Sequence, residues 1–198
     1  MRPDLAIIAD LIRQQARVLD LGCGRGELLA HLQDTKGVLG YGLEKDADQI
    51  TACIAAGVNV IEHDLNEGLS RFPDNSFDMV VMTETLQAVE APETMLDEML
   101  RIGEECIVTF PNFGHWMCRV RLLTGGRMPV APHIPHTWYD TPNIHLCTFA
   151  DFERLCTDKG LPIIQRFVTD RHYRNRTLIN RFANLFGTTA FYRLGRAR

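Results

Sequence analysis

Three glycines and an aspartate fall within one short loop, Asp20-Leu21-Gly22-Cys23-Gly24-Arg25-Gly26, directly after an apolar run. Because glycine has no Cβ, its backbone can turn with positive φ and approach a ligand closely. In the dinucleotide pattern Gly-x-Gly-x-x-Gly the third glycine would stand at Glu27. The misplaced third glycine and the acid at the loop entry disfavour a pyrophosphate and favour a ligand that carries positive charge.

Two further acidic positions are candidates for binding a nucleoside. Glu44 ends an apolar run, where a carboxylate can accept hydrogen bonds from both hydroxyls of a ribose. Asp64 can accept from an adenine amine while Leu65 packs on the ring, although either acid is also a common cap or turn residue. The complete set of candidate ligand-binding residues is Asp20, Gly22, Cys23, Gly24, Gly26, Glu44, Lys45, Asp64, Leu65 and Thr83.

The elements that must position these residues follow an alternating pattern. Short apolar runs alternate with stretches of helical periodicity, which is typical of parallel βαβ units. We expect strands at 17–21, 38–44, 58–61, 77–83, 106–110, 163–168 and 188–194, and helices around 5–12, 28–32, 46–57, 92–100, 148–160 and 178–186. The pattern predicts a single α/β domain over residues 1–198, with a mostly parallel seven-stranded sheet and helices on both faces. In such a sheet the candidate acids would meet at the carboxyl ends of successive strands.

Composition limits the class of protein. The chain has 198 residues, 45% hydrophobic and 23% charged, with a net charge of −4, which suits one ordinary domain. The sequence has neither a run long enough to span a membrane nor the pattern of a secretory signal, so we expect a cytoplasmic protein. Its six cysteines form no Cys-x-x-Cys pair, which disfavours a disulfide framework or zinc knuckle.

Two segments depart from the regular pattern. Residues 111–147 hold five of the nine prolines, both tryptophans and four of the seven histidines, and are expected to form a long loop that is a lid or a partner surface. The pair His133 and His136, followed by His145 and Cys147, fits no structural zinc spacing, and we expect no metal site.

Residues 166–198 form a basic C-terminal element with eight arginines and one acid. This segment is either a solvated face or an element that faces a partner. Nucleic-acid binding is disfavoured because the remainder of the chain is acidic and contains only three lysines.

The glycine loop and the acids resemble those of the class I methyltransferases, which bind S-adenosylmethionine. The resemblance covers roughly residues 15–110 and implies that S-adenosylmethionine or S-adenosylhomocysteine is the cofactor. Glu44 then corresponds to the ribose acid, Asp64 to the adenine acid, and residues 83–86 border the sulfonium.

Four longer strings carry a closer resemblance: Thr85-Leu86-Gln87-Ala88, Phe110-Pro111-Asn112-Phe113-Gly114-His115-Trp116, Gly126-Arg127-Met128-Pro129 and Trp138-Tyr139-Asp140-Thr141-Pro142-Asn143-Ile144-His145. Together with the glycine loop they resemble the MetW family over about residues 15–165. The resemblance implies a role in methionine biosynthesis as a partner or activating subunit of a homoserine O-acyltransferase of the α/β-hydrolase type.

The sequence shows no recognisable catalytic motif. Methyl transfer often requires a group that removes a proton from the acceptor, and Glu84, His115, Tyr139 and His145 are candidates. Acyl transfer would require a Gly-x-Ser-x-Gly nucleophile elbow, which is absent. Two functions therefore stay open, a cofactor-binding partner subunit and a methyltransferase acting on a small-molecule acceptor.

Overall fold

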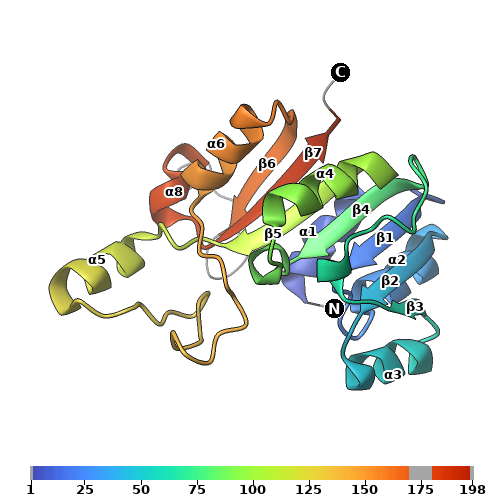
Figure 1. Ribbon diagram of the computed structural model, residues 1–198, viewed down its shortest axis with the longest axis horizontal. Coiled ribbons are helices and arrows are strands. Elements are labelled where there is room, and N and C mark those ends of the chain that lie inside the picture. The colour runs from blue at the N-terminus through green and yellow to red at the C-terminus, as the bar shows by residue number, and fades with distance from the viewer. Residues whose placement is uncertain (1, 170–179, 197–198) are drawn as a thin grey trace.

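One sheet organises the part of the chain that the computed structural model describes, residues 2–169 and 180–196. Within these residues seven strands lie in the order β3-β2-β1-β4-β5-β7-β6 (Figure 1). The strands are β1 (Arg17–Leu21), β2 (Leu39–Glu44), β3 (Asn59–Glu62), β4 (Phe77–Thr83), β5 (Gly103–Pro111), β6 (Ile163–Thr169) and β7 (Thr189–Gly195). The helices are α1 (Pro3–Leu11), α2 (Glu27–Lys36), α3 (Ala47–Ala55), α4 (Pro92–Ile102), α5 (Trp116–Gly125), α6 (Phe149–Asp158) and α8 (Ala183–Phe186), with short 3-10 helices η1 (Leu65–Glu67) and η2 (Leu86–Ala88).

The pairing confirms the expected mostly parallel sheet. β1 to β5 pair in parallel, whereas β7 runs antiparallel to both β5 and β6. The chain proceeds from β1 to β2 and β3 on one side, then returns to place β4 on the other side of β1. This reversal opens a crevice at the carboxyl ends of β1 and β4, where open α/β sheets bind their ligands.

Helices cover both faces of the sheet, as expected. Ile8 of α1 and Leu29 of α2 are buried in one apolar cluster, while Leu96 of α4 and Phe152 of α6 are buried in the other. Figure 1 shows α4 and α6 on the near face of the sheet and α1 and α2 behind it. The sequences of the central strands are continuous apolar runs because both faces of the sheet are covered.

Local capping agrees with the sequence. Asp46 caps α3 by accepting hydrogen bonds from the amides of Asp48 and Gln49, and Thr148 and Asp151 form the expected capping box of α6. β5 begins at Gly103, earlier than predicted, because α4 passes directly into it. The last predicted helix is confirmed only as α8, and its residues 178 and 179 lie outside the described chain.

The long loop expected at 111–147 is interrupted by one helix, α5, over Trp116–Gly125. We call residues 112–147 the arm, because Figure 1 shows α5 and the following loop extending away from the sheet. His115 caps α5 by accepting a hydrogen bond from the amide of Met117. Of the α5 residues, all of which the structure describes, Cys118 is the one that is buried. Because so little of α5 packs on the core, its sequence lacks the helical spacing of apolar residues by which a packed helix is recognised.

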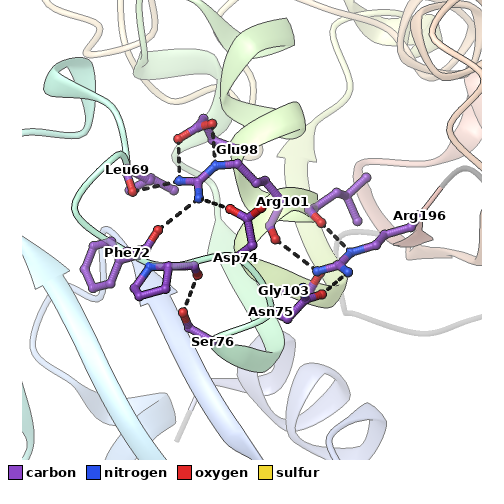
Figure 2. Close-up of polar contacts among 11 residues, drawn as sticks. Leu69, Phe72, Asp74, Asn75, Ser76, Glu98, Arg101, Gly103 and Arg196 are labelled. Carbon is purple, nitrogen blue, oxygen red and sulfur yellow. Dashed lines mark hydrogen bonds and ion pairs between the residues drawn. The ribbon is translucent and has the colours of Figure 1, made fainter.

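Arginines of the basic C-terminal element contribute to the fold. Arg166 pairs with Glu153 at 2.8 Å, and Arg193 pairs with Glu105. Figure 2 shows Arg196 donating to Gly103 O and to Asn75, beside Arg101, which binds the turn before β4. The positions 171, 174, 176 and 198 lie outside the described residues.

Among residues 2–169 and 180–196, no helix is both long enough and apolar enough to cross a membrane.

Candidate functional site

Two adjoining cavities open at the carboxyl ends of the central strands, and they share Gly22 in their walls. The first, of about 400 Å³, lies beside the ends of β2 and β3, and the second, of about 670 Å³, lies beside β1, α1 and the start of α2. Of the residues predicted to bind a ligand, the first is lined by Gly22, Glu44, Lys45, Asp64 and Leu65 and the second by Asp20, Gly22, Cys23, Gly24 and Thr83.

The three loop glycines have different roles. All adopt positive φ, at 73° for Gly22, 56° for Gly24 and 75° for Gly26. A Cβ on Gly22 would lie 2.7 Å from the hydroxyl of Thr85, and one on Gly26 would press on Cys53 and Val58. A Cβ on Gly24 would instead project into open space among the described residues. Gly26 is thus required for packing at the start of α2, whereas Gly24 leaves bare backbone in the cavity wall.

Glu44 fastens the glycine loop to the end of β2. Its Oε2 accepts from the amide of Gly24 at 2.9 Å, and its Oε1 accepts from the amides of Lys45 at 2.9 Å and Asp46 at 3.1 Å. The sequence predicted a carboxylate available to a ribose but not these contacts. Because the carboxylate both shapes the loop and lines the first cavity, one side chain controls two parts of the site.

Asp20 is a buried carboxyl in the wall of the second cavity. It is 3% exposed, and its Oδ1 has no hydrogen-bond partner within residues 2–169 and 180–196. Burial, together with the nearby charge of Glu44, raises the pKa of Asp20 to about 7. A buried oxygen of this kind is costly without a donor, so the position suits a ligand that brings a positive charge or an N–H group.

Asp64 has the cap role that its residue type also allowed. Its Oδ1 accepts from the amide of Asn66 at 3.0 Å, and Lys45 Nζ lies 3.5 Å from its Oδ2. The hydrogen bond from Asn66 and the positive charge of Lys45 lower the pKa of Asp64. Leu65, next to it, is buried and gives the first cavity an apolar wall.

The two cysteines near the loop are free thiols. Cys23 Sγ and Cys53 Sγ lie 3.8 Å apart, and Cys53 donates to the carbonyl of Gly24 at 3.0 Å. Burial raises the pKa of the Cys23 thiol. These thiols therefore pack the loop against α3.

The four catalytic candidates are not brought together. Glu84 follows β4 with φ of 52°, lies 3.3 Å from Arg2 Nη2, and has its pKa raised by burial. His115 lies at the base of the arm, where burial and His133 lower its pKa to about 4. Tyr139 is exposed on the arm. His145 contacts the carbonyl of Glu90 and lines a separate apolar groove.

Several residues that line the cavities carry no sequence motif. Arg2, at the N-cap of α1, and Leu5 of α1 line the second cavity, and Asn66, Ala88 and Val89 line the first. Only the position of α1 over the sheet places the first pair there, so no local signal identifies them. Asn66 stands two residues after Asp64, and this short spacing could have suggested that Asn66 also lines the first cavity.

The chain matches known proteins over almost its whole length. The family model described as "Methionine biosynthesis protein MetW" matches residues 2–194. A curated relative from Rhodopirellula baltica, named "Bifunctional methionine biosynthesis protein MetXA/MetW", is 36% identical over 192 residues. The match covers 92% of this chain but only 31% of that protein.

Solved structures share the fold at low sequence identity. An S-adenosylmethionine-dependent methyltransferase from Mesorhizobium loti is 14% identical with a TM-score of 0.72, covering 98% of both chains. Another from Archaeoglobus fulgidus is 18% identical with a TM-score of 0.70, covering 98% of this chain and 91% of the other. The fold is therefore the Rossmann-like fold of the class I methyltransferases, in one domain.

Proposed function

The chain belongs to the MetW family of methionine biosynthesis proteins, and from this premise we propose that it binds S-adenosylmethionine or S-adenosylhomocysteine and acts as a partner subunit of a homoserine O-acyltransferase. The subunit would activate that enzyme in the cytoplasm. The observation that carries the cofactor part is the buried oxygen of Asp20, which has no hydrogen-bond partner in the described part of the chain and shares a cavity wall with the bare backbone of Gly24.

The donor set fits the cofactor in both cavities. Asp20 and the glycine loop would hold the positively charged methionyl part, and Glu44 would hold the ribose. Asp64 and Leu65 would hold the adenine, the first through its amine and the second by apolar contact. When bound, S-adenosylmethionine supplies a methyl group on a positively charged sulfur.

The proposed role as a partner subunit is supported by the name of the curated relative, which joins two proteins. The name of the Rhodopirellula protein joins MetXA and MetW, and the present chain matches 31% of it. Two units carried on one polypeptide have a high effective concentration for each other, which suits units that assemble. Because this chain lacks a nucleophile elbow, the serine chemistry would belong to a partner of the α/β-hydrolase type.

Co-expression with the homoserine O-acyltransferase of the same organism tests the partner role. The two proteins are expected to co-elute in size-exclusion chromatography, and the acyltransferase is expected to be several-fold more active with this chain than alone. Titration of S-adenosylmethionine into the assay then shows whether the cofactor regulates the complex, which requires different cofactor affinities in the bound and free states. An acyltransferase that is fully active alone and never co-elutes would contradict the proposal.

The alternative function is methyl transfer to a small-molecule acceptor. It is favoured by Glu84, because burial raises the pKa of this carboxyl and thereby makes it a better proton acceptor next to the cavity residue Thr83. This function predicts acceptor-dependent formation of S-adenosylhomocysteine from a metabolite extract. Absence of turnover with a protein shown to bind the cofactor would exclude it for the acceptors present.

The affinity for S-adenosylmethionine is expected to rise between about pH 6 and 8. In the free protein the pKa of Asp20 is raised from 3.8 to about 7, so protonation is favoured below that value and a cationic ligand must displace the proton. For the same reason, the contribution of this group to the stability of the free protein is present below the ordinary pKa of 3.8 and is lost as the pH rises from there to about 7. Isothermal titration calorimetry of wild type and Asp20→Asn measures the effect. The variant is expected to bind more weakly with a flatter pH dependence, and an equal slope in both proteins would contradict the assignment.

A further inference from the structure

The arm presents large apolar side chains to solvent. Leu123 on α5 is 86% exposed, and Trp138 and Tyr139 on the following loop are 74% and 73% exposed. Trp116, Val120 and Met128 are also exposed. Single exposed apolar residues are ordinary. Several large ones on one segment, here the arm, are typical of an interaction site, where tryptophan and tyrosine are enriched.

The base of the arm is fixed by buried polar contacts. Asn112 is fully buried, and its Nδ2 donates to Gly187 O at 2.8 Å while its Oδ1 accepts from Gly114 N at 2.9 Å. Arg119 Nε donates to Gly114 O at 2.6 Å, and His133 Nε2 lies 3.2 Å from Asn112 O. The root of the surface is thereby held in place before any partner arrives, which lowers the entropic cost of binding.

The far end of the arm is attached to the wall of the first cavity. The amides of Ile144 and His145 donate to the carbonyl of Gln87 at 2.9 and 3.0 Å. Gln87 belongs to η2, whose next residue, Ala88, lines that cavity. The arm is thus fastened to the body at both of its ends.

The charge of the arm is mainly positive, with three arginines against the single acid Asp140. The sequence has no acidic residue between Glu105 and Asp140, whereas Arg119, Arg121 and Arg127 fall in this stretch of a chain whose net charge is −4. Arg121 and Arg127 are exposed, as are the large apolar side chains of the arm. A complementary surface would be apolar with an acidic rim. Two arms packed on each other symmetrically would instead bring like charges together, which disfavours a second copy as the occupant.

We propose that the arm is the surface that binds the homoserine O-acyltransferase, through an apolar patch with an acidic rim on that enzyme. This inference rests on the proposed function, which supplies the identity of the partner. Leu123, Trp138 and Tyr139 form the apolar contact, and Arg121 and Arg127 determine the orientation and the salt dependence of binding.

Leu123→Asp tests the apolar contact. The full-length variant is expected to bind the purified acyltransferase at least tenfold more weakly than wild type in biolayer interferometry. Because Leu123 is almost fully exposed, the melting temperature of the variant and its affinity for S-adenosylhomocysteine are expected to equal those of wild type. Ile54→Asp is the matched control, since Ile54 is a 66% exposed apolar residue of α3, outside the arm, and this variant is expected to bind like wild type.

The double variant Arg121→Glu, Arg127→Glu tests the rim. Its binding is expected to be weaker, and to depend less steeply on salt, than that of wild type. Wild-type affinity in both this variant and Leu123→Asp would overturn the arm assignment while leaving the proposed function intact. The assignment would also be overturned if Leu123→Asp abolished self-association of this chain, measured by sedimentation, and left acyltransferase binding unchanged. Failure of the wild-type protein to bind would contradict the proposed function and the arm assignment with it.

Discussion

Replacement of Glu44 by alanine is expected to weaken the binding of S-adenosylmethionine and S-adenosylhomocysteine by about 100-fold or more. Hydrogen bonds to a charged group contribute about 1.5–3 kcal/mol each, and a tenfold change in affinity corresponds to about 1.4 kcal/mol. The substitution removes the acceptor proposed for two ribose hydroxyls. It also releases the amides of Gly24, Lys45 and Asp46, so the loop loses its attachment to β2.

Isothermal titration calorimetry measures this loss, with thermal unfolding as a check on the fold. Glu62→Ala is the matched control, because Glu62 pairs in register with Glu44 at the end of β3 and lies outside both cavities. The control is expected to bind like wild type. Unchanged affinity in Glu44→Ala would remove Glu44 from the site.

Phe110→Ala is expected to lower the free energy of unfolding by about 3–5 kcal/mol. The Phe110 ring is fully buried, and its centroid lies 4.9 Å from that of Phe152, 5.9 Å from that of Tyr192 and 6.0 Å from that of Phe149. Truncation would leave a cavity among rings that α6 and β7 hold in place, and the surrounding structure relaxes only partly around such cavities. For a chain of this size the melting temperature should fall by about 10 °C.

Urea denaturation measures the change in stability. Phe182→Ala is the comparison, since Phe182 is 53% exposed and its loss is expected to cost little. Equal stability of the two variants would show that the aromatic cluster is not a centre of packing.

The central half of the fold could be predicted because its signals are local. Residues 18–21 of β1 are buried and the glycines after them have positive φ. Gly57, also with positive φ, follows the end of the helix that Asp46 caps. Each of these residues determines the local conformation of the chain within a few positions of itself in the sequence. The acids at the strand ends could be placed at the crevice for the same reason, since a strand end fixes which edge of a parallel sheet a residue occupies.

The remaining features depend on contacts between distant segments. α5 lacks an apolar face packed on a core, and its root is held by Asn112 reaching the carbonyl of Gly187 near β7. Arg2 reaches the second cavity only because α1, which it precedes, packs on one face of the sheet. Neither the bond from Gly24 to Glu44 nor the position of β7 beside β5 follows from periodicity, because both join residues far apart in the chain.

The final strand, β7, lies inside the sheet between β5 and β6 instead of at its edge. A chain emerging from the ribosome therefore cannot close its sheet until residues 189–195 have left the exit tunnel. Until then, the backbone of β5 has an open edge and Phe110 lacks the stacked ring of Tyr192. The sheet is thus completed only after residues 189–195 have been synthesised, and the unfinished sheet is the stage at which the nascent chain most needs protection from aggregation.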